Sequence, residues 1–425
     1  MIRLLKNSIL QRKFKAGALQ FTIAFALLVL MILMSFLLFN QLKGSEIVYM
    51  QINQGLRRDI DSSVLIMEES PSYFDNGSSE ICLNREFFID SVHVKVKDWA
   101  FFQLVNFQER HNQFYRQKVF LFTDDIQKNK LRPSLYLSDP NKYLSVGGKT
   151  YLGANTYLPT YGVRKAYLDG VGYYRDSLVQ GISHHALPNL PELNSDLRDK
   201  YKTMSDGISS LDSIVDLGNV KTDTIDNSFA SKRLVIKCPK GTVMKNLYLR
   251  GNIIVLGPDL EIKNSVTLEN CIVLSQRITI EKRFCGSAQF ISKNSINAGD
   301  SCKFNSPTVL YQDGEQNCDG IHLGAFCFLT GDIIQPTDAL VNAEALTLGE
   351  NSKIIGQVYC NGLVSFRGTL FGSMFCRGFM LRTPRGVFSN YLINACIDYG
   401  RLPKEYAGVS LTSERNGKRC MLQVL

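Results

Sequence analysis

The chain of 425 residues is 45% hydrophobic and 10% aromatic, which is enough for a well-packed core and excludes an intrinsically disordered chain. Its net charge of +9 is spread unevenly, because residues 1–17 carry five basic side chains and no acidic one. Over the remaining residues the positive excess is mild. The composition therefore argues against a nucleic-acid-binding protein, and we expect no nucleic-acid partner.

An apolar run follows the basic segment. The 19 residues from Phe21 to Phe39 include only two polar ones. At about 1.5 Å per residue, a helix of this length crosses the roughly 30 Å hydrocarbon layer, so residues 18–40 are predicted to be a transmembrane helix in contact with membrane lipid. A cleaved secretory signal is the alternative, but its apolar core would be about 7–15 residues long and would end at a small-x-small site, which Asn40–Lys43 lacks.

The position of the basic segment predicts the orientation of this span. Because the positive charges precede it, we expect the amino terminus in the cytoplasm, one crossing of the inner membrane, and the bulk of the chain in the periplasm or outside. Apolar residues then recur at every fourth position, which predicts an amphipathic helix over residues 41–70. These residues are Val48, Ile52, Leu56, Ile60 and Val64.

A long helix that is apolar at its start and docks on a globular head is also how pilin subunits are built. The stretch Lys15-Ala16-Gly17-Ala18-Leu19 resembles the start of some minor pilins. The glutamate that most pilins carry five residues after the cleavage point is missing, since Thr22 stands there. The resemblance implies a component of a pilus or secretion assembly that is processed at Gly17.

The most informative pattern is a six-residue repeat from Ile254 to Ile280. Two apolar residues at i and i+2 lie on one face of a short strand, and here such pairs follow one another in unbroken register. A short strand and a corner every six residues is typical of a parallel β-helix. A helical period of 3.6 cannot keep one face at a spacing of six. The pairs expected to point inward are Ile254/Leu256, Leu260/Ile262, Val266/Leu268, Ile272/Leu274 and Ile278/Ile280.

A second run covers residues 353–397 and carries three phased series, each with a spacing of six. Through Gly356–Cys360 and Gly368–Gly372 it resembles the bactofilin-like group of polymer-forming β-helix proteins. That resemblance implies a β-helix able to associate with itself, although an export-oriented anchor and a separate head depart from the cytoplasmic bactofilins. The series are Val358, Val364, Leu370 and Cys376; Ile354, Cys360 and Phe366; and Gly356, Gly362 and Gly368.

These patterns together predict a mainly β protein. It has a single transmembrane helix, a small α+β head, a parallel β-helix expected to be right-handed, and a C-terminal hairpin that caps the last coil. The expected parts are a basic cytoplasmic segment (1–17), the transmembrane helix (18–40), the amphipathic helix (41–70), the head (71–143), the first β-helix coils (144–181), an inserted loop with a short helix (182–232), the main β-helix (233–400) and the cap hairpin (401–425), which turns at Asn416-Gly417.

The eleven cysteines contain no Cys-x-x-Cys motif, which excludes the common zinc and redox patterns. Several follow one another at about the length of one coil. We expect them to stack inside the β-helix as small hydrophobic residues, with disulfides between coils in an oxidising compartment as the alternative.

We expect no catalytic, cofactor-binding or metal-binding residue. Asn317-Cys318-Asp319-Gly320 is similar to the opening of the polygalacturonase set, but the second carboxylate that inverting hydrolysis needs about 6.5–9.5 Å away does not follow it. Asp124-Asp125 lies far upstream. His322 is the sole candidate for a histidine of the hexapeptide acyltransferase type, and Ser183-His184-His185 has no further ligand at metal spacing.

The tyrosines of residues 144–181 leave two interpretations open. They pack between coils, or their flat faces stack on sugar rings of a polysaccharide. The leading hypothesis is a membrane-anchored structural or interaction protein of a bacterial envelope, with protein partners or self-association. The alternatives are a minor-pilin-like component and a carbohydrate-active β-helix enzyme.

Overall fold

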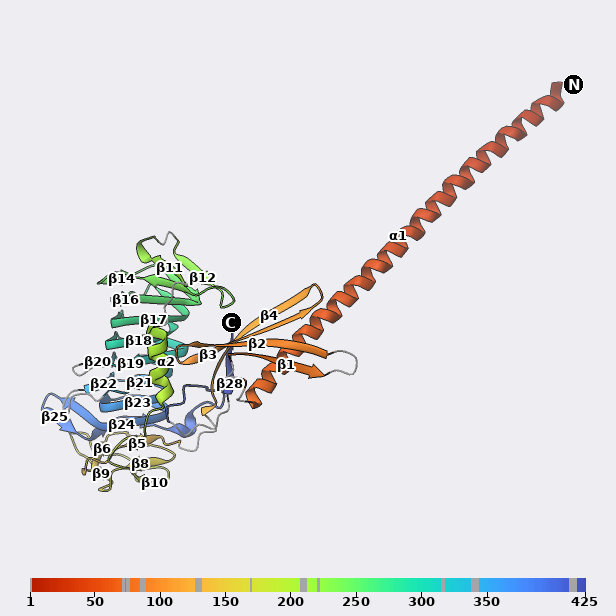
Figure 1. The fold of residues 1–425 in the computed structure, drawn as a ribbon. Helices are drawn as coiled ribbons and strands as arrows, with labels where there is room; N and C mark the ends of the chain where they lie inside the picture. The colour runs from red at the N-terminus through yellow and green to blue at the C-terminus, as the bar shows by residue number, and fades with distance from the viewer. Residues whose placement is uncertain are drawn as a thin grey trace. The chain divides into compact units, whose positions relative to one another are not determined.

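The computed structural model describes residues 2–70, 73, 77–84, 89–126, 132–168, 170–206, 212–219, 222–314, 318–337, 344–412 and 419–425 (Figure 1). The chain forms two compact units. One consists of residues 1–63, 82–92 and 108–116, and the other consists of residues 64–81, 93–107 and 117–425.

The first element is a long helix, α1 (Ile2–Glu69). All side chains from Gly17 to Gln51 are exposed, including the whole apolar run, while Leu56, Ile60 and Met67 further along are buried. The helix is long and apolar enough to cross a membrane, as the composition predicts. Its end at Glu69, just before Ser70-Pro71, agrees with the expected boundary.

A five-stranded sheet follows, in the order β1-β2-β3-β4-β28. In β2 the valines at positions 92, 94 and 96 are buried and alternate with partly or fully exposed residues, as expected for a half-buried strand. In the described residues of 77–124 the structure has strands and turns and no α-helix, so no helix of the expected α+β head lies there. The strands are β1 (Ser78–Asn84), β2 (Ile89–Trp99), β3 (Phe102–His111), β4 (Phe114–Asp124) and β28 (Arg419–Val424).

The C-terminal strand differs from the expected cap. β28 pairs antiparallel with β4, with Cys420 opposite Thr123, and it extends the head sheet instead of covering the last coil. Pairing with β4 is favoured because it closes an otherwise open edge of the head sheet. The expected turn at Asn416-Gly417 lies outside the described residues.

Most of the chain lies in one closed sheet whose strands pair in parallel, except for β25, which is antiparallel to β24. Ile254 pairs with Ile272 and Val358 pairs with Met374, so partners are 18 and 16 residues apart. Figure 1 shows these strands as successive layers. They are β5 (Leu135–Leu137), β7 (Tyr151–Leu152), β8 (Thr156–Leu158), β10 (Ser183–His185), β11 (Ser213–Asp216), β12 (Thr224–Asn227), β13 (Leu234–Lys237), β14 (Thr242–Met244), β15 (Tyr248–Gly251), β16 (Ile253–Ile262), β17 (Thr267–Ile280), β18 (Cys285–Ala298), β19 (Lys303–Gln312), β20 (Gly320–Leu323), β21 (Phe328–Gln335), β22 (Glu344–Leu348), β23 (Lys353–Phe366), β24 (Thr369–Thr383), β25 (Gly386–Ser389) and β27 (Cys396–Ile397).

The order of the layers differs from the order of the chain. β5 pairs with β24, and β7 pairs with β27, so the earliest strands of this sheet lie against its latest ones. β5 therefore belongs to the parallel sheet, although residues 71–143 were expected to form the head. A small side sheet repeats this arrangement in the order β26 (Tyr391–Ile393), β6 (Leu144–Gly147) and β9 (Val163–Lys165).

The chain must then return from β10 to β11, which lies at the other end of the stack next to β13. The helix α2 (Ser195–Asp206) lies on this path (Figure 1). Residues 182–232 are therefore not an independent loop inserted into the stack. They supply β10, β11 and β12 to the sheet, and they connect its two ends.

One buried cluster fills the inside of the closed sheet. It contains every member of the two apolar series of residues 353–397, the one that begins at Val358 and the one that begins at Ile354. This confirms that these side chains point inward. It also contains Leu260, Ile262, Val266, Leu268, Ile278 and Ile280, as predicted. In contrast, Ile254, Leu256, Ile272 and Leu274 lie in or against a second cluster on the outer face, and Ile253, Val255, Cys271 and Val273 point inward in their place.

This error has a physical reason. The wall made by β13, β16, β17 and their successors is apolar on both faces, and a period of two does not then tell which face is inside. The cysteine prediction holds for six residues, which lie in the inner cluster, and no disulfide joins any of the eleven cysteines. The six are Cys238, Cys271, Cys302, Cys327, Cys360 and Cys376.

Candidate functional site

A ladder of side chains crosses the outer face of the parallel sheet. Each member pairs with the next on the neighbouring strand, and the series changes from aliphatic at one end to aromatic at the other. We call this series the outer ladder. It consists of Lys237, Leu256, Leu274, Ile291, Tyr311, Ile334, Tyr359, Phe375, Tyr136, Tyr157 and His184.

The aromatic part of the outer ladder is stacked. The ring centroids of Tyr136 and Tyr157 lie 5.2 Å apart at an interplanar angle of 20°, and those of Tyr157 and His184 lie 4.9 Å apart at 26°. Such offset stacks stabilise neighbouring strands by about 0.5–1.5 kcal/mol per pair beyond the area they bury. The packing interpretation is therefore confirmed for Tyr157, whereas Tyr161 and Tyr167 are exposed.

The middle of the outer ladder is covered by three segments. The turn between β2 and β3 places Phe101 4.7 Å from Tyr311, and α2 places Tyr201 5.5 Å from the same ring. The third segment contributes Val409 and Leu411. This cover explains why residues on the outside of a sheet are apolar, because they form a second core there.

A buried glutamine holds the β2–β3 turn on the sheet. The side-chain oxygen of Gln289 accepts a hydrogen bond of 3.0 Å from the backbone nitrogen of Phe101, and its amide donates one of 3.0 Å to the carbonyl of Trp99. Gln289 is 2% exposed, so both bonds are shielded from water. Buried polar groups with satisfied partners fix one arrangement of the segments that they join.

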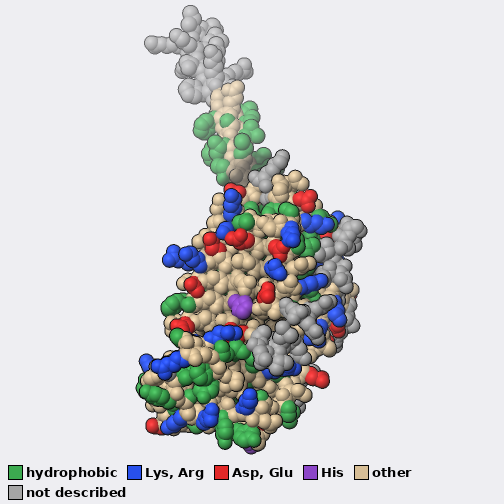
Figure 2. Space-filling view, turned by 90° about the vertical axis from the view of Figure 1, so that its left-hand side faces the viewer, with side chains coloured by type: hydrophobic (Ala, Val, Ile, Leu, Met, Phe, Trp, Pro, Cys, Tyr) green, Lys and Arg blue, Asp and Glu red, His purple; other side chains and the backbone are tan. Residues whose placement is uncertain are grey.

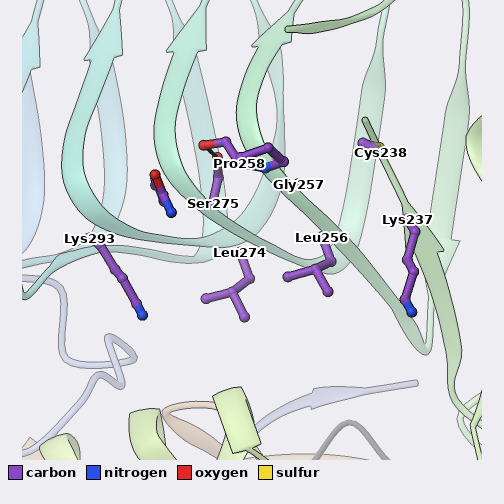
Figure 3. A pocket seen from close by; sticks show the side chains of 9 residues that line it. Lys237, Cys238, Leu256, Gly257, Pro258, Leu274, Ser275 and Lys293 are labelled. Carbon is purple, nitrogen blue, oxygen red and sulfur yellow. Dashed lines mark hydrogen bonds between the residues drawn. The ribbon is translucent and has the colours of Figure 1, made fainter. Parts of the chain in front are cut away.

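The cover ends before the aliphatic end of the outer ladder, and a hollow of 380 Å³ opens there. Figure 3 shows Leu256 and Leu274 side by side on its floor, pointing away from the sheet. Cys238, Gly257, Pro258 and Ser275 form the wall behind them. The hollow is the place where the second core meets solvent.

Two lysines stand at opposite sides of this floor, Lys237 from β13 and Lys293 from β18 (Figure 3). Both side chains are exposed, and neither forms an ion pair with any residue in the described part of the chain. Because the hollow brings no acid of its own, both charges are available to a ligand. We call these two lysines and two leucines the lysine-flanked hollow.

Of the other polar groups of the hollow, Gln276 is exposed, whereas Ser275 is already engaged. The hydroxyl of Ser275 lies 2.7 Å from the carbonyl oxygen of Arg277 and 3.0 Å from that of Pro258, so it holds the corner. Burial raises the pKa of the Cys238 thiol to about 11, which keeps it protonated at neutral pH and makes it a poor nucleophile. The hollow therefore offers an apolar floor and two cations, a set suited to binding.

The residues considered for catalysis are not brought together. The ring of His322 contacts the backbone carbonyl of Asp319 at 2.6 Å, not its exposed carboxylate. Asp124 pairs with Arg419 at 2.7 Å and accepts a hydrogen bond from the backbone of Ser410, so it joins β4 to the C-terminal segment. Asn317 lies outside the described residues.

The adjacent histidines have separate surroundings. His184 ends the outer ladder on Tyr157, and His185 is exposed. Among the residues that the structure describes, no three His, Cys, Asp or Glu side chains are placed to hold a metal ion.

Sequence reasoning missed the lysine-flanked hollow, although a signal for it exists. Val235 and Lys237 share the outward direction of β13, and Ile291 and Lys293 share that of β18. Along each of these strands, the outward-pointing residues change from apolar to charged. This change marks the point where the outer face of the sheet is no longer covered. This signal can be recognised only when it is known that other segments of the chain cover the apolar residues that point outward.

Comparison of the chain with family models, with curated proteins and with solved structures found no match. The function is therefore argued from the geometry of the outer face.

Proposed function

We propose that this protein is a membrane-anchored interaction protein of a bacterial envelope. In this proposal α1 crosses the inner membrane once, with its amino terminus in the cytoplasm and the remainder of the chain outside it. The exposed apolar run of α1 and the basic residues before it support this orientation. The closed parallel sheet is proposed to wind as a β-helix, since its strands repeatedly pair with strands 16–18 residues later.

Such a body is proposed to act as a rigid scaffold. Its inner cluster draws on residues from Leu135 to Ile397, and its outer face has a second core under α2 and the β2–β3 turn. Close-packed interiors on both sides of one wall resist deformation. A surface carried by this wall keeps its shape before a partner binds, which lowers the entropic cost of binding.

The observation that carries the proposal is the lysine-flanked hollow. An apolar pocket next to unpaired charges is typical of protein interfaces, where an anchor side chain fills the pocket and charges at the rim select the partner. We propose that the partner is a protein segment that inserts an aliphatic or aromatic side chain between two acidic residues. The leucines receive the apolar group, and Lys237 and Lys293 pair with the acids.

A binding titration tests this. The full chain in lipid nanodiscs is titrated with a fluorescent peptide in which two leucines stand between acidic residues. We expect charge reversal at both Lys237→Glu and Lys293→Glu to weaken binding by about tenfold or more, because two attractive pairs become repulsive. The matched control is Lys240→Glu, an exposed lysine outside the hollow. Equal affinities of the double variant and the control contradict the proposal.

A further inference from the structure

A second surface of the parallel sheet carries cations and aromatic rings in strict alternation. Lys353 lies with its Nζ 5.9 Å from the ring centre of Phe328 and 5.1 Å from that of Phe371. Arg401 then lies 5.7 Å from the ring of Phe371 and 5.5 Å from that of Tyr151. Every one of these distances is within the range of a cation–π contact.

The alternation continues at both ends. Arg175 lies 4.9 Å from the ring centre of Tyr151. At the other end Lys303 is the strand neighbour of Phe328 in the parallel ladder. We call this series the cation–ring stripe: Lys303, Phe328, Lys353, Phe371, Arg401, Tyr151 and Arg175.

The cations of the stripe are accessible. Lys303, Lys353, Arg401 and Arg175 are exposed, and the rings between them are half-buried. Arg401 pairs with Asp398 at 3.2 Å, whereas the other three form no ion pair with any residue that the structure describes. Phe371 and Tyr151 each contact two of these cations, and a cation held against a ring keeps its charge and can still pair with an anion.

Figure 2 shows how charged and apolar side chains are spread over one face of the molecule. On the face that it draws, acidic and basic side chains mix over the upper and middle layers. Toward the lower end, at the height of β5 to β10 in Figure 1, basic and hydrophobic side chains predominate.

The spacing of the stripe identifies the kind of ligand. Lys303, Phe328 and Lys353 are partners on the successive strands β19, β21 and β23, at a strand spacing of about 4.8 Å. Phe371 on β24 lies two residues beyond Thr369, the partner of Lys353, and Arg401 lies after β27 in the 3-10 helix Tyr399–Arg401. Lys303 and Lys353 therefore lie two strand spacings apart, roughly 10 Å, with the ring of Phe328 between them. A matching ligand is a linear polymer whose repeating units are each about as long as one strand spacing. It carries one negative charge for every two such units.

We propose that the cation–ring stripe binds a linear acidic polysaccharide in which charged and uncharged sugars alternate. An extended sugar unit is about as long as one strand spacing. Carboxylates of the charged sugars pair with the lysines and arginines, and the apolar faces of the uncharged sugars lie on the exposed parts of the rings. This site is separate from the lysine-flanked hollow and does not depend on the function proposed for it.

Nucleic acid fits the stripe poorly. A nucleic acid strand in a duplex carries one charge per 3.4 Å, about three times the density of cations in the stripe. An acidic polysaccharide with a charge on every sugar has about twice as many charges per unit length as the stripe has cations. The alternation of rings with cations thus favours one charge per two sugars.

The test compares polymers of different charge density on the full chain in nanodiscs. Hyaluronan has one carboxylate per two sugars, polygalacturonate has one per sugar, and dextran is neutral. We expect hyaluronan to bind most tightly, with an affinity that falls as salt rises because exposed charges are screened. Dextran binding as tightly as hyaluronan, or polygalacturonate or duplex DNA binding more tightly, overturns the proposal.

Variants locate the site. Lys353→Ala is expected to weaken hyaluronan binding by about five- to tenfold, as expected for one charge-assisted contact, and Lys353→Arg is expected to retain it. Phe371→Leu keeps an apolar side chain but removes the ring, and we expect a smaller loss. The control Lys240→Ala removes an exposed cation outside the stripe and is expected to have no effect. Equal losses from Lys353→Ala and Lys240→Ala at unchanged melting temperature also overturn the proposal.

Discussion

The hydroxyl of Tyr406 donates a hydrogen bond of 2.8 Å to the carboxyl group of Asp332, which is 1% exposed. The other oxygen of this carboxyl accepts a bond of 2.7 Å from the backbone nitrogen of Val409. Gln357 on the adjacent strand donates as well, through its backbone at 3.1 Å. Asp332 thus fastens the segment after β27 to the outer face of β21, and Val409 of this segment covers the outer ladder.

This arrangement predicts a pH dependence of stability. Burial raises the pKa of Asp332 to about 6, although these three donors and the side-chain amide of Gln357, at 3.3 Å, favour the charged form and act in the opposite direction. In the unfolded chain the pKa is about 3.9, so the folded protein binds the proton more tightly between the two values. The stabilising contribution of Asp332 is therefore fully present below about pH 4 and is lost as the pH rises through about 6.

We expect Asp332→Asn to remove this dependence. Between pH 4 and pH 7 the wild type should lose about 2 kcal/mol of unfolding free energy relative to the variant, as a shift of two pKa units implies over this interval. Denaturant unfolding at both pH values measures the difference, and Asp199→Asn on the exposed side of α2 serves as the control. Identical pH profiles of the wild type and Asp332→Asn would show that this carboxyl does not titrate in that interval.

The two faces of the parallel sheet predict different effects of one substitution. Leu268 is fully buried in the inner cluster, and Leu268→Asp should cost several kcal/mol because the charge has no partner there. Leu256→Asp on the floor of the hollow can be solvated and lies beside Lys237, so its cost should be much smaller. Thermal unfolding compares the two variants. A similar fall in melting temperature would contradict the assignment of Leu256 to the outer face.

The path of the chain predicts that residues 186–212 are required for folding. They join β10 to β11 across the full stack, so replacing them with a short linker should prevent the sheet from closing. Leu197→Ala should cost about 2–3 kcal/mol, since it opens a cavity over the outer ladder. The matched change Lys202→Ala on the exposed side of α2 should be neutral. A folded, fully stable deletion variant would show that this connection is only an appended loop.

Some of the fold can be predicted from sequence and some cannot. The inward series of residues 353–397 is readable because polar residues such as Gln357, Ser365 and Ser373 interrupt the opposite direction there. At Ile254 and Ile272 the neighbours are apolar too, and the direction becomes ambiguous. The pairing of Leu135 with Met374 is also not readable, because a parallel ladder leaves no local signal of which distant strand is the neighbour.

The candidate site was missed for a related reason. Lys237 and Lys293 lie far apart in sequence, and the layers between β13 and β18 bring them to the two sides of one floor. The cation–ring stripe likewise draws on seven separate segments. Because its contacts cross strands, no local spacing could predict it.

The anchor predicts an intact amino terminus. We expect the protein extracted from membranes to retain residues 1–40, since the apolar run of α1 is long enough to stay in the bilayer. Mass spectrometry of the extracted protein measures the first residue. A start near residue 40 would indicate a secretory signal, and a start at Ala18 would favour the pilin alternative.

The most direct test of the central claim is site-specific photo-crosslinking in the membrane of living cells. A photoreactive amino acid replaces Leu256 in the lysine-flanked hollow or, as the control, Tyr359, whose hydroxyl lies against Pro191 beneath the covering segments. We predict that position 256 forms an adduct with one partner at an apolar residue beside acidic ones, that Lys237→Glu with Lys293→Glu abolishes this adduct, and that position 359 links only within the chain. Adducts from position 256 that form only with lipid or water, or that persist in the double variant, would contradict a protein-binding role for the hollow.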